Sequence, residues 1–149
     1  MSLYGTPVTD EEAAALEAED EAVEADIERA REQQQKVDRV AFLRLKKEHG
    51  AHRVGIYALG RACFKPGWPT LFVMQTMDGI AKHRVEQMLG SNSPQKKAQG
   101  LKCAAVDALL YPDEPTFVAM CKVFQHLEGN FALASLELSR ARGEAEGKG

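Results

Sequence analysis

Large apolar residues are sparse and regularly spaced in the first forty positions of the chain. Alanine and glutamate dominate up to position 30, and Thr9 with Glu12 forms a capping box that starts a helix. The larger apolar side chains recur at spacings of seven, four, three and seven residues, a pattern typical of a coiled-coil-like seam. The seam consists of Leu16, Val23, Ile27, Ala30 and Val37.

The pattern predicts a break after this helical arm. Three glutamines at 33–35 interrupt it, and a second helix is expected over "DRVAFLRLKKEHG", ending at Gly50 as a left-handed stop. Two interpretations of the arm fit the sequence. It is a solvated helix, or it docks on a partner or on a second copy.

One segment alternates with the period of a β-strand. "HRVGIYALGRACFK" places Val54, Ile56 and Ala58 on one face, turns near Gly60 and returns through Phe64. The sequence therefore predicts a two-stranded hairpin, which the prolines at 66 and 69 end because they cannot donate a ladder hydrogen bond.

The rest of the chain shows helical spacing. Thr70 is expected to cap a helix over 71–90, and Asp113 to cap one after the corner at 111–113. Gly129 and Asn130 are expected to break the chain before a last helix. After the helix over 71–90, the predicted helices span 95–111, 116–127 and 131–141.

These elements predict an α+β fold that is mostly α-helical, with one short β-hairpin. We expect an acidic helical arm over 1–36, a helical domain with the hairpin over 37–142 and a disordered tail over 143–149. The arm carries a net charge of −8 and the rest of the chain +5, which together give the total of −3. An acidic arm could fold back on the basic body or reach a basic partner.

The composition argues against a membrane-spanning, secreted or disulfide-rich protein. No apolar run is long enough for a membrane span, and the start lacks the pattern of a secretory signal. Three widely spaced cysteines suit buried thiols in a reducing cytoplasm better than a disulfide framework.

Candidate catalytic and metal-binding residues are few. His49 and His52, with His83 as a third, have roughly the spacing of metal ligands, but Gly50 separates the pair and no cysteine or carboxylate joins them. Cys103 and Cys121 lie on different predicted helices, and no phosphate-binding or nucleophile motif is present. The sequence therefore predicts no metal, no cofactor and no enzymatic activity.

Contact residues for a protein partner are expected on the body and on the arm. Trp68, on a stiff loop between Gly67 and Pro69, either anchors a partner peptide or fills the gap between the hairpin and the next helix. The methionines of the 71–90 segment suit an adaptable groove or an ordinary core. The candidate contact residues are Trp68, Phe72, Met74 and Met77 on the body, with Leu16, Val23 and Ile27 on the arm.

The order of elements resembles the tail assembly chaperones of tailed phages and prophages. The segment "AFLRLKKEHGAHRVGIYALGRACFKPGWPTLFVMQTM" contains a Lys65-Pro66 turn, and a later helix ends in the corner Tyr111-Pro112-Asp113. The similarity covers residues 40–139. It departs from the family pattern at "HLEGNF", where a "YPGL"-like segment is usual, and the arm has no counterpart.

The resemblance implies a non-enzymatic role in the cytoplasm of a bacterial host. Such chaperones bind the long helical tape-measure protein, keep it soluble and recruit tail-tube subunits. Two alternatives stay open. One is a structural virion component, such as a neck, baseplate or tail protein that remains in the particle. The other is a nucleic-acid-binding regulator, since basic clusters alternate with aromatic residues, although the acidic arm and a pI near 5.8 argue against it.

Overall fold

The computed structural model describes residues 8–147 of the chain, and side chains for residues 8–143. Over this range the protein has the mostly helical α+β fold that the sequence predicts. No helix within it is long and apolar enough to cross a membrane. The elements are α1 (Asp10–His49), η1 (Ala51–Arg53), β1 (Val54–Ala58), η2 (Arg61–Cys63), β2 (Leu71–Gln75), α2 (Gly79–Leu89), α3 (Pro94–Ala108), β3 (Leu109–Tyr111), α4 (Glu114–Val123) and α5 (Leu127–Gly147).

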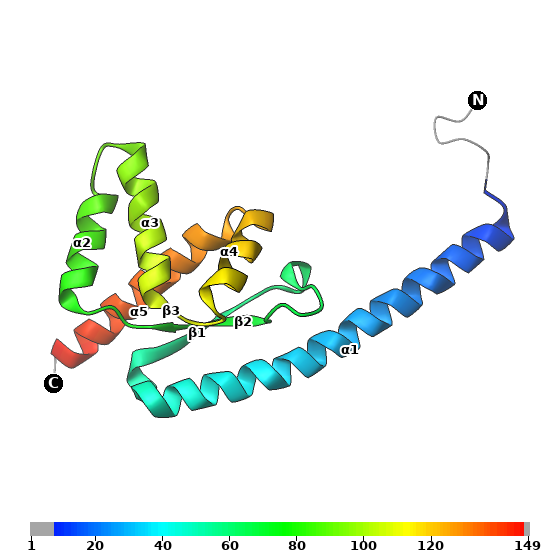
Figure 1. The fold of residues 1–149 in the computed structure, drawn as a ribbon, viewed down its shortest axis with the longest axis horizontal. Helices are drawn as coiled ribbons and strands as arrows, with labels where there is room; N and C mark the ends of the chain where they lie inside the picture. The colour runs from blue at the N-terminus through cyan, green and yellow to red at the C-terminus, as the bar shows by residue number, and fades with distance from the viewer. Residues whose placement is uncertain (1–7, 148–149) are drawn as a thin grey trace.

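A small antiparallel sheet lies at the centre of the body. Its strand order is β1-β2-β3, so β2 is the middle strand, with Tyr57 opposite Phe72 and Val73 opposite Tyr111. Figure 1 shows the C-terminal half of α1 running along one side of the sheet, while α2 to α5 gather on the other. The N-terminal half of α1 extends away from the body.

Aromatic side chains from three elements form the centre of the core. Phe72 of β2, Phe117 of α4 and Phe131 of α5 are at most 1% exposed, and their ring centroids lie 5.1 to 5.5 Å apart. Val73 is also fully buried but lies outside this cluster, because successive side chains of a strand point to opposite faces. The middle strand is therefore covered on both sides.

Helix α1 is continuous, so the predicted break at the three glutamines is wrong. Glutamine has a good intrinsic helix propensity, and no glycine or proline interrupts the segment. The predicted ends are confirmed: the Glu12 amide donates to Thr9 Oγ1 at 3.2 Å, and Gly50 ends the helix with φ of 98°.

The sheet differs from the predicted hairpin in its second strand. The first strand is confirmed, but η2 is a helical turn, and the partner of β1 is β2, which lies in the segment expected to be helical. Thr70 therefore caps no helix; α2 starts at Gly79, where Asp78 Oδ1 accepts from the Ala81 amide at 2.8 Å. The run "LFVMQ" lacks alternation because both of its faces are buried, and periodicity alone cannot separate such a strand from a helix.

The C-terminal third also departs from the prediction at element ends. Residues 109–111 form β3 instead of continuing a helix, and α5 begins at Leu127, so Gly129 and Asn130 lie in its first turn. Helix α5 reaches Gly147, within the segment expected to be disordered; positions 148–149 lie outside the described residues.

Close packing of α3 against α2 generates a stability prediction. A Cβ at Gly100 would lie 2.9 Å from Met88 Cβ, too close for either helix to accommodate without moving. We expect Gly100→Ala to lower the free energy of unfolding by about 1–3 kcal/mol, despite alanine's better helix propensity.

The matched control is Gly143→Ala in α5, where the added methyl group meets no neighbour within 4 Å. Urea unfolding of both variants checks the prediction. If Gly100→Ala is as stable as Gly143→Ala, the close approach of the two helices is wrong.

Candidate protein-interaction surface

The carboxyl group of Asp38 joins α1 to the sheet. Asp38 is fully buried, and its Oδ2 accepts hydrogen bonds from the Thr70 amide at 2.6 Å and from Thr70 Oγ1 at 2.5 Å. Its Oδ1 accepts from the Tyr111 hydroxyl at 2.5 Å and from Gln34 Nε2 at 2.8 Å. Because each carboxyl oxygen accepts two bonds, the polar group is satisfied in its buried position.

The contact with Asp38 also affects the pKa of Tyr111. Burial, followed by the hydrogen bond to Asp38 and the proximity of its charge, raises the pKa of Tyr111 well above the ordinary 10.0. The hydroxyl therefore stays protonated and continues to donate. Tyr111 belongs to the corner that carries the family resemblance, and its peptide bond to Pro112 is cis.

Beyond this anchor, α1 carries apolar side chains that the body does not cover. Leu16 is 59% exposed and Val23 is 55% exposed, while Ile27 is half-buried. Val37 is 57% exposed although it lies next to the anchored Asp38. We call Leu16, Val23, Ile27, Ala30 and Val37 the α1 seam. The structure thus leaves most of the predicted seam accessible.

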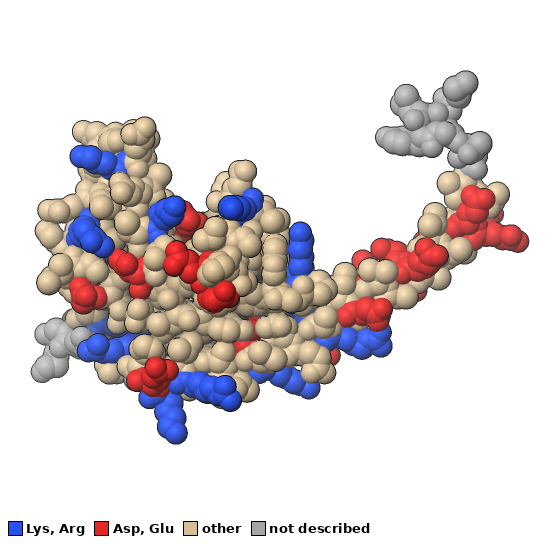
Figure 2. Space-filling model, viewed as in Figure 1, with Lys and Arg blue, Asp and Glu red and all other residues tan. Residues whose placement is uncertain are grey.

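Strong negative charge surrounds the projecting part of the seam. Residues 10–26 contain no lysine or arginine, and Figure 2 shows acidic side chains along this part of α1. Where the helix reaches the body, Glu28 accepts an ion pair from Arg61 of η2 at 2.8 Å. A partner helix with basic side chains beside its apolar face would complement this surface.

The structure separates the predicted contact residues of the body from those of the arm. Phe72 is fully buried and Met74 only 7% exposed, so neither reaches a partner unless the core opens. Met77 is partly buried against the core. Trp68 is also partly buried, and its ring packs edge-on against Phe124 at 6.1 Å, so it fills a gap beside the end of α4.

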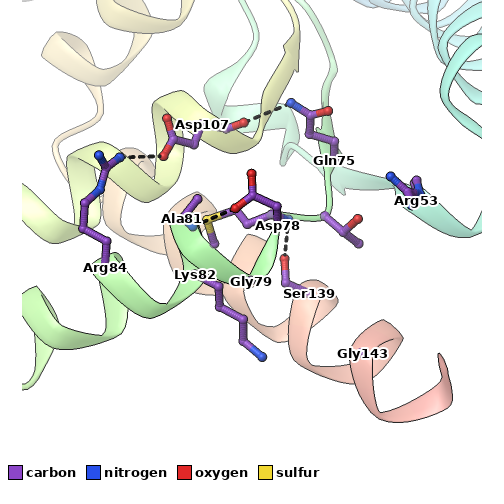
Figure 3. Close-up of a pocket in the computed structure, with 12 residues that line it drawn as sticks. Arg53, Gln75, Asp78, Gly79, Ala81, Lys82, Arg84, Asp107, Ser139 and Gly143 are labelled. Carbon is purple, nitrogen blue, oxygen red and sulfur yellow. Dashed lines mark hydrogen bonds and ion pairs between the residues drawn. The ribbon is translucent and has the colours of Figure 1, made fainter. Parts of the chain in front are cut away.

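A polar hollow lies beside α2. Its volume is about 720 Å³, and Figure 3 shows it between the loop after β2, α2 and the C-terminal part of α5. The lining residues are Arg53, Gln75, Thr76, Met77, Asp78, Gly79, Ala81, Lys82, Arg84, Asp107, Ser139 and Gly143.

Both carboxylates of this hollow are engaged in local structure. Asp78 caps α2, and Asp107 pairs with Arg84 at 3.5 Å while its backbone carbonyl accepts from Gln75 at 3.1 Å. Among the described residues, no three His, Cys, Asp or Glu side chains are grouped to hold a metal ion. His49 ends α1, His52 lies in η1 and His83 lies in α2.

The sequence pattern does not predict the role of Asp38, nor Thr70 and Tyr111 as its partners. A signal was present: Asp38 lies four and seven residues before Phe42 and Leu45, on the helix face that meets the body. An acid on an apolar helix face needs partners, but the sequence does not show which distant groups supply them.

The buried anchor predicts a large loss of stability on truncation. Asp38→Ala leaves the Thr70 amide and hydroxyl and the Tyr111 hydroxyl without their acceptor, so we expect a loss of about 3 kcal/mol in the free energy of unfolding. Tyr111→Phe removes one donor and should cost about 1 kcal/mol. Asp26→Ala is the matched control, because Asp26 is exposed and pairs with the exposed Arg29 in the next turn. Urea unfolding measures all three, and equal stability of the two aspartate variants would contradict the anchoring role.

The thiol of Cys121 predicts a pH dependence. Burial, with the nearby charge of Glu128 as the smaller cause, raises its pKa from 9.0 to about 11. Its alkylation rate, followed by mass spectrometry, should therefore rise with pH up to about 11. The folded protein keeps this thiol neutral up to a higher pH than the unfolded chain does. The contribution of Cys121 to the free energy of unfolding is therefore complete below pH 9.0 and is lost as the pH rises to about 11.

Glu128→Gln should lower the midpoint of the alkylation profile only in part, because burial is the larger cause. An unshifted midpoint near 9.0 in the unmodified chain would show that the thiol is not shielded.

Comparison with known proteins identifies no relative of this chain. Models of protein families, curated proteins and solved structures all give no match. The resemblance to tail assembly chaperones therefore stays a prediction from the sequence pattern.

Proposed function

We propose that the protein is a non-enzymatic assembly factor that binds a helical segment of another protein through the α1 seam. The observation that carries this proposal is the exposure of Leu16 and Val23 on a helix that projects beyond the packed body. A helix with an uncovered apolar stripe gains most by burying that stripe against a second helix.

The charge of the arm defines the partner's chemistry. Residues 10–26 hold nine acids and no base, so the preferred partner is an amphipathic helix with lysine or arginine beside its apolar stripe. Such a surface keeps an apolar helical protein soluble by covering its stripe while presenting carboxylates to water. This is the role that the resemblance to tail assembly chaperones implies, with a tape-measure protein as the partner and tail-tube subunits as later contacts.

The body supports this proposal as a scaffold. Phe72, Phe117 and Phe131 pack into a closed core, and the carboxylates of the polar hollow are engaged in a helix cap and an ion pair. The buried Asp38 holds α1 against this rigid unit. The body therefore presents the arm in a fixed direction, which lowers the entropy cost of binding.

Binding to a defined peptide tests the proposal. The probe is a synthetic helix with leucine at each heptad a and d position and lysine at the flanking positions. We expect it to bind the full chain and to bind at least about tenfold more weakly to Leu16→Asn/Val23→Asn, since two apolar contacts are lost. Fluorescence anisotropy of the labelled peptide gives the dissociation constants.

Two controls separate apolar binding from charge attraction. Ile80→Asn carries the same kind of change at an 87% exposed position on α2, away from the seam, and should bind like the unmodified chain. A peptide with serine in place of leucine keeps the charge and should bind weakly. Equal binding of both peptides would contradict an apolar interface.

The partner's identity is tested in the bacterial host. Affinity capture should recover a long helical tape-measure-like protein with the unmodified chain and lose it with Leu16→Asn/Val23→Asn. Mass spectrometry of purified particles distinguishes a chaperone, which is absent from them, from a structural component, which is present in stoichiometric amounts. Capture of nucleic acid alone would contradict the proposal.

A further inference from the structure

Opposite charges occupy the two halves of α1. Residues 10–26 hold nine acids and no base, whereas residues 29–47 hold seven bases and two acids, one of which is the buried Asp38. Two such helices side by side in parallel would place like charges together, whereas an antiparallel pair places each acidic half beside a basic half. The bases are Arg29, Arg31, Lys36, Arg39, Arg44, Lys46 and Lys47.

The α1 seam has the same centre as this charge distribution. It runs from Leu16 to Val37, so its midpoint falls between Asp26 and Ile27, just before the charge changes sign at Arg29. An antiparallel pair therefore superimposes seam on seam and acid on base in one arrangement. The seam is about 32 Å long, or three heptads, which is sufficient for a short coiled coil.

The body leaves room for this pairing. Val37 is 57% exposed beside the junction, and Lys46 and Lys47 are exposed at the end of α1. Asp38 lies one residue further, about 100° around the helix, and keeps its contacts to the sheet. A second helix can thus reach the basic half along the side of α1 that exposes Val37.

We propose that α1 of a second copy, in antiparallel orientation, covers the seam until a partner helix replaces it. This inference rests on the proposed function, because the same seam would bind the partner. Before the partner binds, the second copy covers the exposed apolar residues of the seam and so prevents their non-specific association.

A polar residue on the seam face makes this pairing weak enough to exchange. Asp20 lies one turn after Leu16, so it falls at a core position of the heptad pattern. Such residues reduce the stability of a coiled coil while fixing its orientation. A homodimer of this kind dissociates readily when a fully apolar partner helix competes.

Sedimentation of the full chain tests for the dimer. We expect a reversible monomer–dimer equilibrium that weakens with salt, because the flanking charges are exposed. Leu16→Asn/Val23→Asn should weaken dimerisation at least about tenfold, while Ile80→Asn leaves it unchanged. A chain that is monomeric at its highest soluble concentration would overturn the inference, as would a dimer that the seam variant does not weaken.

Carbodiimide cross-linking tests the orientation. This reagent joins a carboxylate directly to an amine, and α1 separates Glu17 from Lys36 by about 28 Å within one chain. In a mixture of isotopically labelled and unlabelled copies, mixed cross-links should join Glu17 to Lys36, which the antiparallel arrangement places opposite each other. Mixed cross-links confined to other positions would overturn the antiparallel arrangement.

Competition with the leucine–lysine peptide separates this inference from the proposed function. If both hold, adding the peptide converts dimer to a peptide-bound monomer. If a monomeric chain still binds the peptide, only the dimer is wrong. If the dimer forms but the peptide does not bind, the proposed function is wrong and self-association alone stands. Binding that leaves the dimer intact overturns the shared use of the seam.

Discussion

The buried carboxyl group of Asp38 joins parts of the chain that are far apart in sequence. It accepts from Thr70, 32 residues away, and from Tyr111, 73 residues away, so it connects α1 to the starting end of β2 and to the end of β3. A fully buried carboxyl group without these donors would destabilise the fold strongly. The direction in which α1 leaves the body therefore depends on a small set of short hydrogen bonds.

The body and the projecting half of α1 are stabilised by different interactions. The body is held by close packing, with Phe72, Phe117 and Phe131 in mutual contact and β2 covered on both faces. The projecting half of α1 lacks such packing and depends on alanine and glutamate propensity, on the Thr9 cap and on continuity with the anchored half. An isolated helix of that length is marginal, so the anchor also supports the arm as a helix.

The exposed apolar residues of α1 lie outside the core of the body. The apolar residues of the seam are separated from the body's own cluster, and acidic side chains keep them in water. The polar hollow near Asp78 and Asp107 has its carboxylates committed to local structure. The proposed binding surface therefore lies on α1, where association with a second helix would combine apolar burial with complementary charge.

The sequence by itself determined the elements whose information is local. The Thr9 cap, the stop at Gly50 and the first strand follow from neighbouring residues, and the structure agrees with each. The mostly helical α+β class also follows from these patterns. Local propensity and periodicity are sufficient wherever an element has one apolar face or a distinctive end.

Only the tertiary structure decided the pairing of β1 with β2, the burial of Phe72 and Met74, and the partners of Asp38. The segment from Leu71 to Gln75 is apolar at most positions, and a strand buried on both faces has the same local pattern as a buried helix. Which distant groups satisfy a buried carboxyl group is likewise set by the packing of the whole chain, because hydrogen bonds across the fold leave no periodic signal along it.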